Sequence, residues 1–388
     1  MPAALEGIRV LDLSSVILGP MAAQYLGDMG ADVIKVESPE GDITRSIGPR
    51  RHEGMGALFL ANNRNKRSVV LDLKDPAARA KLRAMVARSD VLLHSIRAPA
   101  AARLGLSWEA LSAVNPRLVL CHVTGFAEGG PYADRPAYDD IIQALSGLAM
   151  LQTVAAGEPR YVPSIICDKI TAVHAALAIA LALFHRERSG RGQEVKVPML
   201  ETLVAFNAAE HLGGHIFEPP LGEMGYAPVR QGLRRPFRTA DGWICLLPYT
   251  DPHWKRFFEV AGRADLAGDP EWATLAGRQR NLDRIWAQVA ELLRARRTEE
   301  WLAELLAADI PVAAVNDLED LLDDPQLAAT GFWEMHAHPS EGMLRLPASA
   351  LGLSATPPSV RRLPPRLGEH TQEVLREFGL ADTDDARG

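Results

Sequence analysis

The first half of the chain alternates short runs of Val, Leu and Ile with longer stretches that have the apolar periodicity of helices. Such short runs are typical of strands that are buried on both faces, as in a parallel sheet. They lie at residues 8–14, 32–37, 68–71, 90–94 and 118–124. Residues 76–88 predict a helix, with Asp75 as its cap and Pro76 at the first helical position. This alternation predicts a doubly wound α/β sheet.

The second half is interrupted by two stretches rich in Gly and Pro, residues 213–236 and 339–368, which predict linkers. The remaining periodic patterns predict strands at 243–247 and 312–315 and helices at 254–262, 282–296 and 371–378. The elements between the two linkers are expected to form a second, smaller α/β domain.

Asp168 stands just ahead of the longest apolar run of the chain, residues 172–184. That run predicts a helix, so the carboxylate of Asp168 is expected at a helix N-terminus. There the unpaired backbone N–H groups and the positive end of the helix dipole favour the ionised form. A carboxylate held in this way is either a helix cap or a nucleophile, and its position alone leaves both interpretations open.

The composition is that of a globular protein with two or three domains. The chain has 388 residues, of which 47% are hydrophobic and 23% charged, enough to bury a sizeable core. Its net charge of −7 argues against a general nucleic-acid binder. Basic residues nevertheless gather at Arg45, Arg50, Arg51, Arg64, Lys66 and Arg67. Such a group either meets a phosphorylated small ligand or forms an ordinary solvated face.

Cysteine usage and targeting signals indicate a cytoplasmic protein. Cys121, Cys167 and Cys245 are scattered and odd in number, which fits a reducing compartment without a disulfide framework. Cys167 is read either as a buried structural residue or as a thiol nucleophile. No signal stretch begins the chain, and residues 172–184 contain His174 and are too few to span a bilayer, so no membrane partner is expected.

Several stretches of the sequence carry a resemblance to a known family. They are residues 5–13 (LEGIRVLDL), 26–37 (LGDMGADVIKVE), 65–74 (NKRSVVLDLK), 125–139 (GFAEGGPYADRPAYD) and 189–202 (SGRGQEVKVPMLET). Together they resemble the class III CoA-transferases, a superfamily that includes formyl-CoA transferases, crotonobetaine–carnitine CoA-transferases and α-methylacyl-CoA racemases. The resemblance spans roughly residues 5–380.

The resemblance implies a particular domain organisation. A large CoA-binding α/β domain of Rossmann-like fold comprises residues 1–212 and 335–388, a linker follows at 213–236, and a small domain covers 237–334. Two subunits thread through each other like linked rings, so the expected partner is a second copy of the chain in an interlocked homodimer.

The resemblance also implies a reaction in which Asp168 is the nucleophile. CoA moves from an acyl-CoA donor to a free carboxylic acid through a covalent aspartyl intermediate, with coenzyme A as part of the substrate and no metal. Because a carboxylate is a weak nucleophile, such a site depends on positioning and on amide donors at the developing oxyanion. The predicted helix N-terminus beside Asp168 is expected to supply those donors.

The resemblance implies that CoA is contacted by the residues at the positions that match the family's CoA-binding segments. They are Ile17, Leu18, Ser38, Leu71, Lys74, Ser95, Arg97, Arg103, Tyr138 and Asp139. Two places depart from the family pattern. The family's N-F-R/K-P-G turn reads Ser-Ile-Arg-Ala-Pro at residues 95–99, so its Asn and Phe are lost. Ser38 stands where some members carry an Arg that stacks on adenine. The contact made at the turn and the packing of adenine therefore stay open.

Tyr138 bears on the choice of activity within the superfamily. The racemases place a His there because they need a base to remove an α-proton, and a tyrosine with an ordinary pKa near ~10 is a poor base at neutral pH. Transfer is therefore favoured over racemisation. Formyl-CoA transferases carry a glycine-run loop, and no such run follows Gly225, so formyl or oxalyl transfer is less expected.

Other classes of function fit the sequence less well. Glu37 ends a predicted strand, where an NAD-binding protein holds the ribose, but residues 14–20 lack the G-x-G-x-x-G turn. His211 and His215 have the spacing of metal ligands, yet two glycines between them interrupt a helix. A non-catalytic CoA-binding protein has no need of Asp168.

Overall fold

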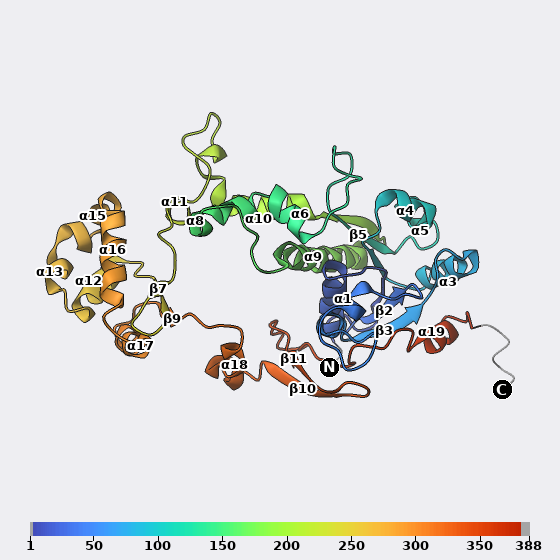
Figure 1. Cartoon of the computed structure of the whole chain (residues 1–388). Coiled ribbons are helices and arrows are strands. Elements are labelled where there is room, and N and C mark those ends of the chain that lie inside the picture. The colour runs from blue at the N-terminus through green and yellow to red at the C-terminus, as the bar shows by residue number, and fades with distance from the viewer. Residues whose placement is uncertain (1–2, 382–388) are drawn as a thin grey trace. The chain divides into compact units, whose positions relative to one another are not determined.

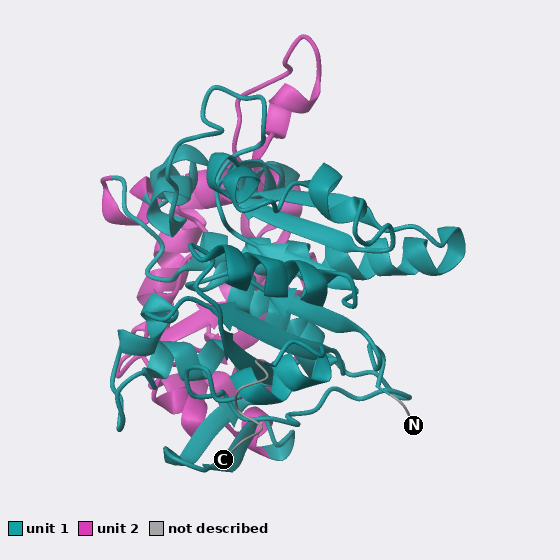
Figure 2. Ribbon diagram, turned by 90° about the vertical axis from the view of Figure 1, so that its right-hand side faces the viewer, with its two compact units in different colours: residues 1–152, 159–209, 329–388 teal, residues 153–158, 210–328 magenta. Residues whose placement is uncertain are grey.

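The computed structural model of the chain describes residues 3–381. They form two compact units, shown in different colours in Figure 2. Unit 1 comprises residues 1–152, 159–209 and 329–388, and unit 2 comprises 153–158 and 210–328. Each unit has its own hydrophobic core, and all of the residues singled out below around Asp168 belong to unit 1.

Unit 1 is built on a six-stranded parallel sheet in the order β3-β2-β1-β4-β5-β6 (Figure 1). Its strands are β1 (Arg9–Asp12), β2 (Asp32–Glu37), β3 (Lys66–Val70), β4 (Val91–His94), β5 (Val119–Thr124) and β6 (Gln193–Pro198). This is the strand order of doubly wound α/β folds, with β1 and β4 side by side at the switch point. The predicted fold class is thereby confirmed for this unit.

Helices between these strands and after the last of them cover both faces of the sheet. They are α1 (Leu18–Asp28), α2 (Ala57–Asn62), α3 (Pro76–Val86), α4 (Ala98–Arg103), α5 (Trp108–Ser112), α6 (Asp139–Leu145), α7 (Leu148–Leu151), α9 (Ile166–Ser189), α10 (Met199–His211) and α19 (Thr371–Glu377), with a 3-10 turn at Ile43–Ser46. The last residues of α10, from Glu210, belong to unit 2. Asp75 caps α3 and Pro76 begins it, as predicted, because the Asp75 side chain accepts from the Ala77 N–H.

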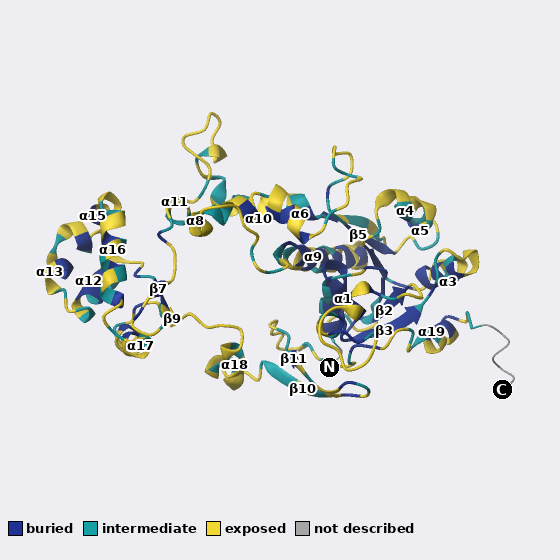
Figure 3. Ribbon diagram, in the orientation of Figure 1, coloured by how far each residue is buried: buried dark blue, intermediate teal, exposed yellow. Residues whose placement is uncertain are grey.

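Successive residues of each strand face opposite sides of the sheet, which gives unit 1 two cores. On one face Val10, Val91 and Val119 pack against α1 and α9. On the other, Leu92 and its neighbours pack against α3, α4, α5 and α19. Figure 3 shows buried residues concentrated on the sheet and on the helices beside it. The continuous apolar runs of the sequence are therefore strands buried on both sides.

Helix α9 is long and apolar because one side of it lies in the core. Among the described residues it is the helix with the length and composition to cross a membrane, with 44% of that window buried inside the protein. Its small residues Ala172, Ala175 and Ala182 pack against the sheet. The opposite stripe carries exposed large apolar side chains, which bear on the proposal of self-association below.

The chain between residues 330 and 350 corrects one prediction. The first residues of the linker predicted at 339–368 form the turn and the second strand of an antiparallel hairpin, in which β11 (Gly342–Pro347) pairs with the preceding β10 (Trp333–His338). Gly342 adopts a φ of 69°, a backbone conformation that favours glycine, directly after the turn. The glycine and proline content of this stretch thus marks a tight turn and its flanks as well as a connection.

Unit 2 is mainly helical, with a small antiparallel sheet in the order β7-β8-β9. Its strands are β7 (Phe237–Arg238), β8 (Trp243–Leu246) and β9 (Val312–Ala314), and its helices are α8 (Thr153–Ala156), α11 (Ala227–Arg230), α12 (Asp251–Val260), α13 (Ala264–Gly268), α14 (Pro270–Ala273), α15 (Leu275–Arg280), α16 (Leu282–Leu293), α17 (Thr298–Ala307) and α18 (Pro325–Ala329), the last ending at the first residue of unit 1. Its aromatic core includes Trp254, Phe257 and Trp301.

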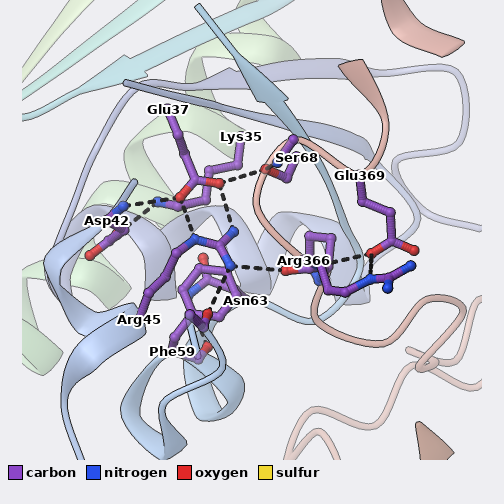
Figure 4. Close-up of polar contacts among 12 residues, drawn as sticks. Lys35, Glu37, Asp42, Arg45, Phe59, Asn63, Ser68, Arg366 and Glu369 are labelled. Atoms are coloured by element: carbon purple, nitrogen blue, oxygen red, sulfur yellow. Dashed lines mark hydrogen bonds and ion pairs between the residues drawn. The ribbon is translucent and has the colours of Figure 1, made fainter. Parts of the chain in front are cut away.

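Most of the basic group near the N-terminus is structural. Arg45, Arg64, Lys66 and Arg67 are buried and paired with carboxylates, so a solvated face is the wrong interpretation for them. Figure 4 shows the guanidinium of Arg45 beside the carboxylate of Glu37. Its Nε and Nη2 donate hydrogen bonds of 2.8 and 2.7 Å to the two carboxylate oxygens.

Glu37 is consequently unavailable to a dinucleotide. Besides the Arg45 pair, it accepts a hydrogen bond of 2.6 Å from the Ser68 hydroxyl. These contacts hold the pKa of Glu37 below its ordinary value although burial acts to raise it. Both oxygens of the Glu37 carboxylate are therefore bonded to Arg45 and Ser68 and do not bind a ribose. The main sequence feature in favour of an NAD-dependent enzyme thus has a structural role.

Candidate active site

A cavity of about 540 Å³ opens where the carboxyl ends of the strands of unit 1 meet the loops that follow them. Its lining includes Ser15, Val16 and Leu18 after β1, Ser95, Arg97 and Ala98 after β4, Val123 and Thr124 at the end of β5, and Gly125, Phe126, Glu128 and Gly129 after it. Residues 133–138, Asp168 and Met199 complete the lining. In parallel α/β sheets, ligands bind at this edge beside the switch point.

Asp168 lies in the first turn of α9, as the sequence predicts. Its side chain lines the cavity, yet the residue is only 8% exposed. No cation pairs with it among the described residues, whereas buried carboxylates elsewhere in unit 1, such as Asp12 and Asp28, have Lys or Arg partners. Asp168 is thus a nearly buried, unpaired acid that faces a cavity.

The cap of α9 is Asp139 rather than Asp168. Asp139 is the first residue of α6, and its Oδ1 accepts a hydrogen bond of 3.0 Å from the backbone N–H of Cys167. The N-cap residue of α9, Ile165, makes no capping hydrogen bond with its own side chain. The structure therefore leaves the carboxylate of Asp168 free of a capping role.

The ionisation of Asp168 differs from the expectation at a helix N-terminus. Burial, and then the negative charge of Asp139, raise its pKa from 3.8 to about 7. Desolvation disfavours the charged form, and here it outweighs the favourable effect of the helix terminus. The protonated form of Asp168 therefore persists to much higher pH than for an ordinary aspartate.

The amide donors expected at this terminus are largely occupied by the protein itself. The N–H groups of Ile166 and Cys167 donate to the Ser164 carbonyl, at 2.8 Å, and to Asp139. The N–H of Lys169 donates to the Ile165 carbonyl at 3.4 Å. The N–H groups of Ile166 and Cys167 are therefore already bonded within the protein and do not serve a developing oxyanion.

Gln143 braces the segment that leads into α9, and sequence reasoning missed it. Its amide nitrogen donates to Asp139 Oδ2 at 3.3 Å and to the Ser164 carbonyl at 3.2 Å. Its oxygen accepts from the Val162 N–H at 2.8 Å. The position of Gln143 one helical turn after Asp139 is the sequence signal that the two side chains share a face of α6.

The turn after β1 has a strained backbone at Val16, which has a φ of 71°. For a β-branched residue this conformation is an outlier and persists only where the surroundings enforce it. Asp42 accepts from the Val16 N–H at 3.3 Å, and Lys35 binds both Asp42, at 2.9 Å, and the Ser14 carbonyl, at 2.9 Å. The pair of Lys35 and Asp42, labelled in Figure 4, thus holds the backbone of this turn through Ser14 and Val16.

Only some of the residues that the resemblance assigns to CoA line the cavity with Asp168. Those in its lining are Leu18, Ser95, Arg97 and Tyr138. Those outside it are Ile17 and Leu71, which are buried in the core, Ser38 and Lys74, which are exposed, Arg103, and Asp139, which caps α9.

Arg103 lies at a second hollow of about 270 Å³, beside α3. Arg79 and Arg83 of α3 line the same hollow over an apolar floor. Arg79 also donates to the carbonyls of Leu73 and Lys74, both at 2.9 Å, so this hollow adjoins the segment of Lys74. The basic residues expected near the phosphates of CoA are therefore divided between two surfaces.

Charged residues of the loop after β5 were missed as cavity residues. Glu128, Asp134 and Arg135 all contribute to the lining. The guanidinium of Arg135 lies over the ring of Tyr132, 4.1 Å from its centroid. These residues belong to the motif at 125–139, but their spacing in the sequence does not predict which of their side chains line a cavity.

The structure offers no support for a metal centre in its described part. No group of three or more His, Cys, Asp or Glu side chains is arranged to hold an ion there. His211 ends α10, and its Nδ1 accepts a hydrogen bond of 3.2 Å from the Tyr226 N–H, while His215 lies in the following 3-10 turn. The two histidines of that spacing therefore belong to different elements.

Comparison with known proteins covers nearly the whole chain. The sequence model of CoA-transferase family III matches residues 5–371. The succinate–glutarate CoA-transferase of Agrobacterium fabrum is 34% identical over 387 residues, which are 96% of this chain and 95% of that protein. The formyl-CoA:oxalate CoA-transferase of Streptomyces avermitilis is 34% identical over 400 residues, which are 98% and 97% of the two chains.

A solved structure agrees with these sequence relatives. A CaiB/BaiF family protein from Brucella suis matches with a TM-score of 0.84 at 30% sequence identity. The match covers 97% of this chain and 100% of the Brucella suis chain.

Proposed function

This chain belongs to CoA-transferase family III, whose members move CoA between carboxylic acids, and from that premise we propose that Asp168 is the nucleophile of the transfer. The observation that carries the proposal is the state of this side chain. It is a cavity-facing carboxylate, nearly buried, unpaired with any described cation, and its pKa is raised to about 7. A more basic carboxylate is a better nucleophile, and groups with perturbed pKa values cluster at functional sites.

The transfer consists of two matching halves. A carboxylate oxygen of Asp168 attacks the carbonyl carbon of the donor thioester, the C–S bond breaks, and a mixed anhydride and CoA thiolate form. The thiolate attacks the carbonyl carbon of Asp168, which releases the donor acid and leaves an aspartyl-CoA thioester. The acceptor carboxylate then attacks this thioester and releases the thiolate again. The thiolate attacks the acyl carbon of the new anhydride, which yields the acceptor's CoA ester and restores Asp168.

For the substrates, we propose short dicarboxylic acids. Relatives named for succinate and glutarate and for formyl-CoA and oxalate are equally identical to this chain, so identity does not separate the two substrate pairs. The glycine-run loop expected for formyl transfer is missing from the sequence, which favours the longer acids. Arg97 and Arg135 line the cavity and are suited to a second carboxylate or to CoA phosphates.

The substrate proposal is tested by a screen of acyl-CoA donors against free acids, with product masses read directly. Succinyl-CoA with glutarate is expected to yield glutaryl-CoA at a higher kcat/KM than formyl-CoA with oxalate yields oxalyl-CoA. The reverse order would assign the chain to formyl transfer.

The covalent step is tested by trapping. After mixing with an acyl-CoA alone, hydroxylamine is expected to convert the activated aspartyl group to a hydroxamate, and peptide mass mapping locates it. Modification at Asp168, and none at the neighbouring acids Asp139 and Asp140, is the expected result. Efficient turnover without any trapped or thioester-linked Asp168 would argue for direct transfer between the two substrates.

We further propose a homodimer, interlocked as the resemblance implies. Its support here is a stripe on α9 at helical spacing, where Val173, Leu177, Leu181 and Phe184 are each more than half exposed. Exposed apolar stripes of this kind mark contact surfaces. A second copy of the chain is the proposed occupant of this stripe.

A cytoplasmic location remains part of the proposal. The cysteines of the chain are free, and Cys245 is exposed. An exposed free thiol is typical of a protein from a reducing compartment. Fractionation of cells that produce the protein is the direct measurement.

A further inference from the structure

Two buried histidines lie side by side on neighbouring strands, each directly before a residue that lines the cavity, Ser95 or Val123, and neither takes part in the chemistry above. His94 ends β4 and pairs in register with His122 of β5. They are 1% and 4% exposed, and their ring centroids are 4.4 Å apart with an interplanar angle of 30°. Such a pair needs an explanation, because buried polar rings are retained only where their hydrogen bonds serve the structure or the site.

His122 holds the turn between β4 and α4. Its Nε2 lies 2.9 Å from the carbonyl oxygen of Ile96, and since a carbonyl only accepts, the ring donates. Ile96 is the middle residue of this turn, and its neighbours Ser95 and Arg97 both line the cavity. The bond therefore fixes the backbone between two residues that face the substrate.

The surroundings of His122 keep its single proton on that bond. Burial lowers its pKa, so that the neutral ring, with one N–H, is the form that prevails at neutral pH. With the proton on Nε2, Nδ1 is bare and cannot donate to Glu128, whose Oε1 lies 3.6 Å away. Glu128 instead binds Lys196 of β6 at 2.5 Å.

His94 packs beside His122 on the neighbouring strand. Burial and the neighbouring His122 lower its pKa to about 3, so it stays neutral. Its Nδ1 has no hydrogen-bond partner among the described residues. The ring of His94 is tilted by 30° to that of His122, packs against it and limits its rotation. His94 also has a hydrogen-bond contact with the Ile96 backbone, which acts to raise its pKa, so both histidines face this turn.

We infer that His122 is a positioning residue for the CoA thioester, acting through the Ile96 carbonyl on the turn at residues 95–97. The turn has lost the Asn and Phe of the family pattern, and the bond from His122 supplies a tether for it from the adjacent strand. With the turn held, Arg97 stays at the cavity wall, ready for an anionic group of the ligand. This inference rests on the proposed function, because it assumes that a CoA ester occupies the cavity.

The test compares variants that keep and remove the donor. His122→Phe retains a ring of similar size without an N–H, and His122→Gln retains an amide donor. His122→Phe is expected to raise KM for the acyl-CoA and Kd for CoA about tenfold, with kcat within about threefold of the parent. His122→Gln is expected to recover most of the affinity. Should His122→Phe fail to fold, His122→Asn, which is too short to reach Ile96, is expected to show the same loss.

His338 offers a matched control. It is a buried histidine of β10 whose Nε2 lies 2.9 Å from the Pro364 carbonyl, and it does not line the cavity. His338→Phe removes this bond and also the two that Nδ1 accepts from the Ser340 and Glu341 N–H groups, at 3.2 and 3.1 Å, and it is expected to lower Tm without changing KM. An equal rise in KM for both Phe variants would show a general loss of stability and would overturn the positioning role.

A double-mutant cycle with Arg97→Ala separates the turn from other effects. If His122 acts by placing Arg97, the two substitutions together raise KM by less than the product of their separate effects. Fully multiplicative effects, or an unchanged KM in His122→Phe, would refute the inference while the parent still binds CoA. A parent protein that binds no CoA would instead refute the proposed function, so the two failures are distinguishable.

Discussion

The carboxylate of Asp139 accepts a hydrogen bond of 3.0 Å from the backbone N–H of Cys167, the residue directly before Asp168. This bond caps α9 from another helix and places a second negative charge beside Asp168. The same residue therefore positions the proposed nucleophile and helps to raise its pKa.

Asp168→Asn is expected to lower transfer at least ~10³-fold while leaving Kd for CoA within a few-fold of the parent, because only the covalent step needs the carboxylate. Turnover and CoA binding are measured on the same preparation. Asp140→Asn, an exposed acid of α6, is the matched control and is expected to keep its activity. Activity of Asp168→Asn within about tenfold of the parent would exclude nucleophilic catalysis by this residue.

The same Asp168→Asn substitution is expected to stabilise the fold at alkaline pH. The folded-state pKa of Asp168 is raised to about 7 from 3.8, so ionisation costs more in the folded than in the unfolded chain. The parent therefore loses stability as pH rises from about 4 to about 7, by up to about 4 kcal/mol, and stays lower above that window.

The measurement for this effect is Tm of both proteins at pH 5 and pH 8. The increase in Tm from the parent to Asp168→Asn is expected to be larger at pH 8 than at pH 5, because the parent carries the buried negative charge at pH 8. An equal gain at both pH values would contradict the raised pKa.

Asp139→Asn is expected to move the acid limb of the pH profile of kcat/KM to lower pH, by ~0.5–1 unit. Transfer requires ionised Asp168, so the rate falls as pH drops through its pKa. Asparagine keeps an oxygen to cap Cys167 but removes the negative charge, and burial, the larger cause of the raised pKa, remains. Asp139→Ala, which also removes the cap, serves as the comparison and is expected to lower Tm further. An unchanged acid limb in Asp139→Asn would mean that the charge of Asp139 does not act on Asp168, and a shift to higher pH would contradict the sign of this effect.

Incubation with a 2-methylacyl-CoA in deuterated water is expected to show little α-deuterium uptake. Racemisation needs a base at the α-carbon, and the resemblance implies that Tyr138 stands where the racemases have a His. An acyl-CoA with a suitable free acid is expected to yield a new CoA ester instead. Fast deuterium incorporation without an acceptor acid would make the chain an isomerase.

The purified protein is expected to be a homodimer that does not exchange subunits under native conditions, since linked chains separate only by unfolding. Tagged and untagged dimers are mixed, and mixed species are counted after affinity capture. Refolding the two together from denaturant is the positive control. Rapid exchange without unfolding would contradict the threaded arrangement.

Local pattern was sufficient for most elements of the fold. The run at residues 32–37 is β2 at the same bounds, and Val10 and Leu11 face the two opposite cores because successive strand residues alternate. The prediction was wrong for β11 and the turn before it, which it placed in a linker. The turn residues of the hairpin have the same composition as a connection, and only pairing between the two strands distinguishes the cases.

For the active site, the sequence by itself determined that Asp168 begins a helix and that its surroundings resemble those of CoA-transferases. Only the tertiary structure decided that Asp139 caps this helix, that burial raises rather than lowers the pKa of Asp168, and that His122 reaches the Ile96 carbonyl. The physical reason is the range of the interactions. Helix initiation and strand alternation depend on neighbours a few residues away, whereas desolvation and cross-strand contacts depend on groups that only the folded sheet brings together.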